Sequence, residues 1–149
     1  MTKTTSYEIS KKLKEAGFGK SSAFAHFKSK CGGGGIFYVW EGIKGGYEKE
    51  FFSYDLETLL DALPDSITRE YKSKQDGEVR EFKERLIIEK EEIHYSCDDI
   101  ENADDANRYF NEYGYMQDIS LFKKFNDNSL ADTAGRLLLL LHEKNLIKF

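Results

Sequence analysis

The sequence predicts an α+β fold, in which a mainly antiparallel meander sheet carries an N-terminal and a C-terminal helix packed on one face. Apolar residues recur at helical spacing near both ends of the chain, and apolar or aromatic runs typical of strands lie between them. Turn signals rich in glycine separate these runs. The chain has 149 residues, a length that suits one core, so we expect residues 1–149 to form a single domain.

The first predicted element is a helix near the N-terminus. Thr5 and Glu8 form a T-x-x-E capping box, and apolar residues follow at helical spacing as far as Gly17, which is placed to end the helix in a left-handed conformation. In SSAFAHFKSK, residues 21–30, two phenylalanines three positions apart predict a short second helix or turn. We therefore expect residues 1–30 to form a helical lobe.

A β-hairpin is predicted after this lobe. Residues 36–40 are apolar on both faces, which is typical of a central strand. Residues 42–46 form a glycine-rich turn, and residues 47–53 return as the second strand. We expect these two strands to pair with each other.

Four consecutive glycines precede the predicted hairpin and are a candidate hinge. They would connect the helical lobe to an acidic sheet-and-helix body, residues 36–149, at a considerable cost in ordering entropy. A phosphate-binding loop is the competing interpretation, but it needs a helix N-terminus with a lysine and a hydroxyl. CGGGGIFYVW leads into a strand instead and has no GK[ST] sequence. The candidate hinge residues are Gly32, Gly33, Gly34 and Gly35.

The middle of the chain predicts one short helix and more strands. Asp55 is placed to cap the helix LETLLDAL, and Pro64, the single proline, follows its end. An Asp-Gly turn at 76–77 predicts a hairpin within residues 67–95. Residues 78–92 are also rich in Glu, Lys and Arg, so a helix there remains an alternative.

The last part of the chain predicts two helices. An acidic stretch, residues 98–105, leads into ANRYFNEYGYM, which suggests a helix ended by Gly114. The C-terminal helix starts at Ser129, has a broad leucine-rich apolar stripe, and ends with Asn145 as its cap. Leu146 is expected to fold back onto this helix.

Charge is distributed unevenly along the chain. The net charge is −5, yet residues 1–30 contain seven lysines and only two glutamates. The remainder is acidic. A basic lobe can attract nucleic acid or an acidic partner, although lysines on a solvated helix face are the alternative interpretation.

The sequence predicts a cytoplasmic protein. The N-terminal MTKTTSYEIS has no apolar run, and the longest later one, LLLLL at 137–141, is far shorter than the ~20 residues that span a bilayer. We therefore expect neither export nor membrane insertion. Cys31 and Cys97 are expected to be reduced thiols, with one long-loop disulfide as the alternative.

Three stretches resemble a known group of proteins. EISKKLKEAGF at 8–18, YDLETLLDALPDSI at 54–67 and SLADTAGRLLLLLHEKNLI at 129–147 are similar to the opening, middle and closing segments of small uncharacterised proteins encoded by phages and prophages. The resemblance implies a phage or prophage origin and the cytoplasm of a bacterial host. It carries over no site residue, because the shared segments are helix caps and core stripes.

No metal or other cofactor is predicted. His94 and Cys97 are three positions apart on a predicted strand, so their side chains point to opposite faces. The chain has no CxxC or HxxxH pair, and residues 98–105 do not fit the EF-hand register. A metal site would need long-range convergence of the residues His26, His94, His142, Cys31 and Cys97.

No catalytic residue is assigned from the sequence. The same histidines and cysteines could form a Cys–His nucleophile pair, and Cys31, beside the glycines, is the more accessible thiol. No recognised local signature supplies a group to orient such a pair. We therefore expect a non-enzymatic protein and keep a thiol-dependent enzyme as an alternative.

The sequence thus predicts an accessory protein that binds another, unidentified protein of the phage or its host. The alternative is a nucleic-acid-binding module that combines cations with stacking surfaces. Arginine, which favours base reading and bidentate phosphate contacts, is absent from residues 1–30. Oligomeric state is not predicted. The candidate contact residues for nucleic acid or an acidic partner are Lys11, Lys12, Lys14, Lys20, Lys28, Lys30 and Trp40.

Overall fold

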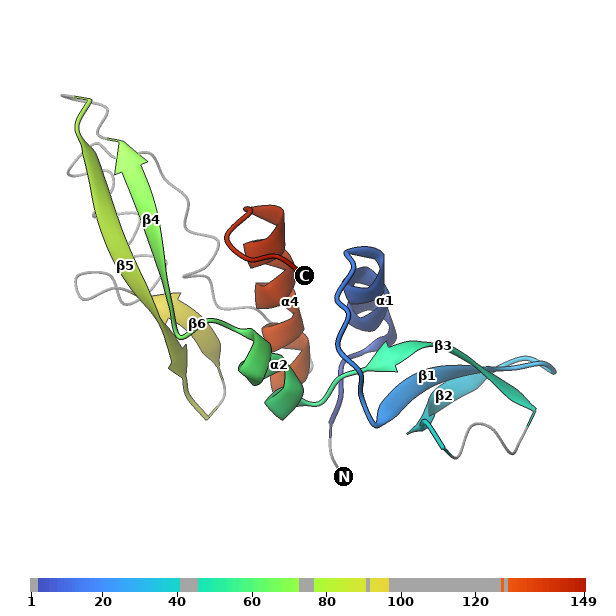
Figure 1. Ribbon diagram of the computed structural model, residues 1–149. Helices are drawn as coiled ribbons and strands as arrows, with labels where there is room; N and C mark the ends of the chain where they lie inside the picture. Colours follow the sequence, from blue (N-terminus) through green and yellow to red (C-terminus); the bar gives the residue numbers. More distant parts are fainter. Residues whose placement is uncertain (1–2, 41–45, 73–76, 91, 97–126, 128) are drawn as a thin grey trace. The chain divides into compact units, whose positions relative to one another are not determined.

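The computed structural model describes residues 3–40, 46–72, 77–90, 92–96, 127 and 129–149. The chain divides into two compact units, of which the first comprises residues 1–62 and 127–149 and the second comprises residues 63–126. The predicted α+β class is confirmed, because the described residues form helices and two three-stranded antiparallel sheets (Figure 1). That the whole chain folds as a single domain stays a prediction.

The first unit contains one sheet with strand order β2-β1-β3 and the helices α1, α2 and α4. β1 lies between its two partners, and all pairings are antiparallel (Figure 1). α1 contacts β3, and α4 contacts both α1 and α2. The element bounds are α1 Tyr7–Glu15, β1 Phe24–Ser29, β2 Gly34–Tyr38, β3 Tyr47–Ser53, α2 Leu56–Ala62 and α4 Leu130–Glu143.

The second unit contains a three-stranded meander with strand order β4-β5-β6. Its strands are β4 Ser66–Lys72, β5 Val79–Ile88 and β6 Ile93–Ser96. The predicted hairpin is confirmed, and the alternative helix over residues 78–92 is wrong. In β5 the side chains of Glu81, Lys83 and Arg85 are exposed, whereas that of Glu84 is buried, so the strand has one solvated face.

Residues 21–30 were predicted to be a helix or turn, and this prediction is wrong. Residues 24–29 form β1, the central strand of the first sheet. Ala25, His26 and Phe27 are all buried; Ser10 and Tyr7 of α1 pack on His26, and Phe37 of the adjacent strand packs against Phe27. Because three consecutive residues are buried, the segment lacks the alternation of apolar and polar residues by which a strand is recognised in a sequence. Phe24 and Phe27 are three positions apart, a spacing that is also typical of a helix.

The predictions for residues 36–40 and their partner need a second correction. β2 is an edge strand and not a central one, and it pairs with β1 instead of β3. The predicted hairpin between residues 36–40 and 47–53 is therefore wrong, although β3 has the bounds predicted for that strand. β1 lies between them and pairs with both.

The ends of the two long helices follow local sequence signals, with one exception. Ser6, not Thr5, is the N-cap of α1, and its Oγ accepts from the backbone N–H of Ile9. Gly17 has a φ of +90° and ends the turn as predicted. In α4 the cap at Ser129 and the left-handed Asn145, with a φ of +59°, are both confirmed.

The core of the first unit lies where α4 packs on α1. Leu137, Leu138 and Leu141 are fully buried, as is Leu13 of α1. A Cβ added to Gly135 would lie 2.6 Å from the Cγ2 of Ile9, so a larger residue at this position would force the side chains between the two helices to shift.

None of the described helices combines the length and the apolar character needed to span a bilayer. The acidic stretch at 98–105, the predicted helix ending at Gly114, and Cys97 lie outside the described residues. The same holds for Asp76 of the predicted Asp-Gly turn, whereas Gly77 has the positive φ, +74°, that such a turn requires.

Candidate binding surface on the first sheet

One face of the first sheet carries a row of large apolar side chains along its β2 edge. Phe24 of β1 lies opposite Tyr38, and His26 lies opposite Ile36, so these side chains project from the same face. The ring of Trp40, which follows β2, stacks on that of Tyr38 with centroids 6.1 Å apart and an interplanar angle of 26°. We call Phe24, Ile36, Tyr38 and Trp40 the apolar row.

The apolar row is open to solvent. Trp40 is 62% exposed, Ile36 45% and Tyr38 44%. Phe24 is half-buried, and its ring centroid lies 4.7 Å from that of Tyr38. Burial of apolar surface against a partner is favourable by about 25 cal/mol per Å², so association here would remove an unfavourable exposure.

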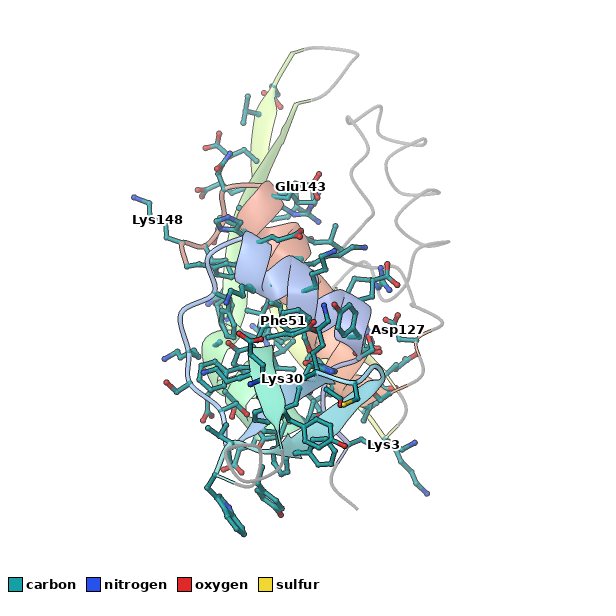
Figure 2. The ribbon with its side chains drawn as sticks, turned by 90° about the vertical axis from the view of Figure 1, so that its right-hand side faces the viewer. Lys3, Lys30, Phe51, Asp127, Glu143 and Lys148 are labelled. Atoms are coloured by element: carbon teal, nitrogen blue, oxygen red, sulfur yellow. The ribbon has the colours of Figure 1, made fainter. Side chains whose placement is uncertain are left out.

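Helix α1 closes the remaining part of the same face. The ring of Tyr7 packs against those of His26 and Phe51, with centroids 5.5 and 5.0 Å apart. Phe51 lies on the sheet beside α1 (Figure 2) and is buried, as is His26. The helix thus covers the β1–β3 side of this face, whereas the apolar row lies on the β2 side.

β2 also presents free backbone groups along its outer edge. The N–H of Ser29 donates to the carbonyl of Gly33, and the N–H of Val39 donates to that of Ala23. In an antiparallel ladder, hydrogen-bonded pairs alternate with pairs whose N–H and C=O groups point away. The even-numbered residues of β2 therefore point their backbone groups outward, and no described strand pairs with them. These residues are Gly34, Ile36 and Tyr38.

The predicted lysines lie on α1 and β1 and on the segments that follow these two elements, and their role as contact residues stays a prediction. On α1, Lys12 forms an ion pair with Glu8 at 3.0 Å, which lowers the pKa of that carboxyl group. The Nζ of Lys14 donates to a main-chain carbonyl of β3 at 3.3 Å. All the predicted lysines are exposed: Lys11, Lys12, Lys14, Lys20, Lys28 and Lys30.

The lysines on the sheet lie far from the predicted stacking residue. Lys28 is at the turn end of the β1–β2 pairing, and Phe24, opposite Tyr38, is at the other end. At about 3.3 Å per residue, these two ends are about 13 Å apart. Lys30 follows β1 beyond one end and Trp40 follows β2 beyond the other, so Lys28 and Lys30 are separated from the rings of Tyr38 and Trp40.

The four glycines of the candidate hinge lie within the β1–β2 hairpin. Gly32 and Gly33 have φ values of +100° and +76° and form its turn. Gly34 belongs to β2, and a Cβ there would collide with the carbonyl oxygen of Phe27. The glycines therefore connect two strands of one sheet instead of joining a helical lobe to a sheet. That they act as a hinge stays a prediction.

A buried serine–histidine contact was not predicted from the sequence. The Oγ of Ser10 lies 3.0 Å from the Nε2 of His26, and the same nitrogen lies 3.1 Å from the carbonyl oxygen of Thr5. That carbonyl can only accept, which favours a proton on Nε2 and leaves no lone pair there to activate the serine. Ser10 is fully buried, so the contact joins α1 to β1 and is closed to a substrate.

Burial has a clear effect on His26. It lowers the pKa of this imidazole, and the hydrogen bond to Thr5 opposes the shift without reversing it. A further hydrogen bond reaches the same carbonyl oxygen of Thr5, because the Oγ of Ser53 donates to it at 2.8 Å. A neutral histidine and hydroxyl groups thus satisfy the polar atoms beneath α1.

The described residues form neither of the two alternative sites considered from the sequence, a Cys–His nucleophile pair and a metal site. Cys31 is exposed with a free thiol, but His26 is bonded to Ser10 and not to this thiol. His94 lies 3.9 Å from a glutamate, and the ring of His142 stacks on that of the C-terminal phenylalanine. Among all the residues that the structure describes, no group of three or more His, Cys, Asp or Glu side chains could hold a metal ion.

Comparisons with known proteins assign neither a family nor an activity. No protein-family model, no curated protein and no solved structure matches the chain. The candidate surface is therefore interpreted from its own residues. Of these, only Trp40 is among the contact residues predicted from the sequence, and residues 36–40 as a whole were expected to form a covered central strand. The run of glycines at residues 32–35 was the one sequence signal that the surroundings of β2 are unusual.

Proposed function

We propose that the protein is a non-enzymatic accessory protein that binds another protein through the apolar row. The observation that carries the proposal is the contact between the exposed rings of Tyr38 and Trp40 at a sheet edge. Monomeric proteins rarely leave contiguous apolar patches uncovered unless they bind something. Tyrosine and tryptophan are also the residues enriched at the energetic centres of protein interfaces.

The phage or prophage origin belongs to the same proposal. It is supported by the three segments that resemble phage-encoded proteins, and it suggests a partner from the phage or from its bacterial host. A cytoplasmic location agrees with this partner. Small accessory proteins of this kind act by occupying a surface of another protein, which requires a contact area but no catalytic group.

The test is a binding experiment with matched variants. Immobilised wild-type protein is incubated with lysate of a candidate host, and stoichiometric partners are compared with those of Tyr38→Ala/Trp40→Ala. The control is Val79→Ala/Ile88→Ala, which removes two similarly exposed apolar side chains of the second unit. We expect a partner that is lost with the first variant and kept with the control. Recovery of no stoichiometric partner, or equal recovery by both variants, would count against the proposal.

Single-stranded nucleic acid is the second candidate ligand. The contiguous rings of Phe24, Tyr38 and Trp40, of which the last two are stacked, favour it, because successive bases stack on aromatic surfaces. The separation of these rings from Lys28 and Lys30 argues against it. If nucleic acid is the ligand, labelled DNA binds in a salt-dependent way and Lys11→Glu/Lys12→Glu/Lys14→Glu abolishes the binding. Absence of binding at low salt would exclude this candidate.

A further inference from the structure

The order of residues in β2 makes this strand complementary to itself. Small and large residues are separated by Ile36, with Gly34 and Gly35 on one side and Phe37 and Tyr38 on the other. When two such strands run antiparallel about Ile36, the large residues of each lie across from the glycines of the other. A bulky side chain that covers a cross-strand glycine is a recognised way to stabilise a sheet edge.

The backbone groups of β2 permit this pairing. The N–H and C=O groups of Gly34, Ile36 and Tyr38 point outward, as the hydrogen bonds to β1 establish. A two-fold pairing centred on Ile36 brings Gly34 opposite Tyr38 and Ile36 opposite its own copy. All outward groups of the strand then find partners at once, whereas a register shifted along the strand leaves some unpaired.

Charge places no obstacle at this edge. Residues 31–40 contain neither a charged residue nor a proline, which are two of the devices by which edge strands avoid pairing with another chain. Ile36 and Tyr38 are nearly half exposed, so their apolar surface is available for burial. Two identical strands can therefore approach without the repulsion that like charges would cause.

We propose that two copies of this chain associate by antiparallel pairing of their β2 strands about Ile36. Tyr38 of each copy lies over the partner's Gly34, and Ile36 contacts the partner's Ile36. The two sheets join into one six-stranded sheet. Directly opposed side chains share a face, so the two apolar rows come to lie on the same side and form one larger binding surface. The association goes beyond the proposed function and does not depend on a further partner.

The first test measures self-association by sedimentation equilibrium. The wild-type chain is expected to dimerise, and Ile36→Lys, which opposes two like charges at the two-fold axis, is expected to weaken dimerisation about tenfold or more. Ile88→Lys is the matched control, because Ile88 is a similarly exposed residue, at 54%, of the second unit. It is expected to leave dimerisation unchanged.

A backbone variant separates the strand pairing from side-chain effects. Ile36→Pro removes an N–H that points outward and leaves the hydrogen bonds to β1 in place, since edge strands accept proline at such positions. It is expected to abolish dimerisation while circular dichroism shows a folded chain, and Ile36→Thr, which keeps the N–H, is expected to dimerise. If Ile36→Pro does not fold, Ile36→Lys and the cross-linking test decide.

The register is tested by cross-linking. In a Cys31→Ser/Cys97→Ser background, Ile36→Cys is expected to form a symmetric disulfide on oxidation, because opposed residues of a hydrogen-bonded pair have Cα atoms about 5.5 Å apart. Tyr38→Cys is expected not to cross-link, since it faces the partner's Gly34.

Three outcomes would overturn the proposal. These are a wild-type chain that remains monomeric at its highest soluble concentration, a dimer that Ile36→Lys leaves intact, and a dimer in which Ile36→Cys does not cross-link. A chain that stays monomeric but binds an extended peptide of another protein at β2 would belong to the first outcome and would assign the edge to a different occupant.

Discussion

The two sheets differ in what their edge strands expose. β2, at the edge of the first sheet, has the uncharged sequence GGIFY and exposes Ile36 and Tyr38. β4, at the edge of the second sheet, has the sequence SITREYK, in which charged residues recur. Charged side chains on an edge strand discourage pairing with other chains. The comparison shows that β2 lacks the charged residues that discourage β4 from pairing with another chain.

The interiors of the two units differ in the same sense. In the second unit, Arg69 and Glu84 form a buried ion pair, in which the Nε of Arg69 donates to a carboxylate oxygen at 2.6 Å. In the first unit, the polar groups beneath α1 are a neutral histidine and hydroxyl groups. The second sheet thus buries an ion pair, whereas the buried contact between α1 and β1 in the first unit is made by neutral groups. The buried Asp132 of the first unit accepts instead from the backbone N–H of Ser6 at 2.7 Å.

The largest expected effect comes from removal of one partner of the ion pair. Glu84→Leu leaves the guanidinium of Arg69 buried without its carboxylate, and this is expected to destabilise the protein by about 3–5 kcal/mol. Unfolding in urea measures the loss. Arg69→Met/Glu84→Leu removes both charges and is expected to cost less than Glu84→Leu alone. A single variant as stable as the wild type would show that the pair does not support the second sheet.

The next effect tests the close approach of α1 and α4 in the first unit. A Cβ at Gly135 would lie 2.6 Å from the Cγ2 of Ile9, so Gly135→Ala is expected to cost about 1–3 kcal/mol by overpacking. Thermal unfolding measures the loss. Gly19→Ala is the control, because a Cβ there meets only one atom, at 3.9 Å. In a double-mutant cycle, Ile9→Ala should relieve part of the cost, and strict additivity would contradict the proposed clash.

A smaller effect is the pH dependence of the first unit. Burial lowers the pKa of His26 in the folded state below the value of about 6.5 that it has when unfolded. The unfolded chain therefore binds more protons below that pH, and the stability from the neutral His26 is complete above about pH 6.5 and is lost as the pH falls through the lowered folded pKa. Urea unfolding from pH 7 to 5 measures this loss. His26→Gln is expected to be less stable at pH 7 and to lose less on acidification; an equal loss would assign the dependence to other groups.

The smallest expected effect is on stability in the apolar row itself. Because the side chains of Tyr38 and Trp40 are exposed, Tyr38→Ala/Trp40→Ala should change the free energy of unfolding by no more than roughly 1 kcal/mol. The same variant is expected to lose partner binding. A large destabilisation measured in urea would mean that these side chains serve the fold, and would remove the contrast between the edges of the two sheets.

Local signals were sufficient for several elements. The bounds of β3, the positive φ at Gly17 and the left-handed Asn145 follow from residues within a few positions of each other. Such features depend on backbone sterics and on capping hydrogen bonds, which short segments carry by themselves. The α+β class follows for the same reason, because helical and strand periodicities occupy different parts of the chain.

The position of each strand within its sheet did not follow from local signals. Residues 24–29 and 36–40 are both rich in apolar side chains, and nothing in either segment states which one the neighbouring elements will cover. The side chains that pack against His26 of β1 come from positions distant in the chain, namely Tyr7 and Phe51. The assignment of β1 as central and β2 as edge therefore needed the tertiary structure.

By itself the sequence determined that this is an α+β protein with capped helices at its ends, an uncharged glycine-rich segment before Ile36, and no local signature of catalysis. Only the tertiary structure decided that this segment is a hairpin turn and an open sheet edge, and that Trp40 belongs to an exposed row. The physical reason is that caps and turns depend on neighbouring residues, whereas exposure depends on which distant side chains arrive to cover a strand. On β2, Ile36 and Tyr38 remain nearly half exposed.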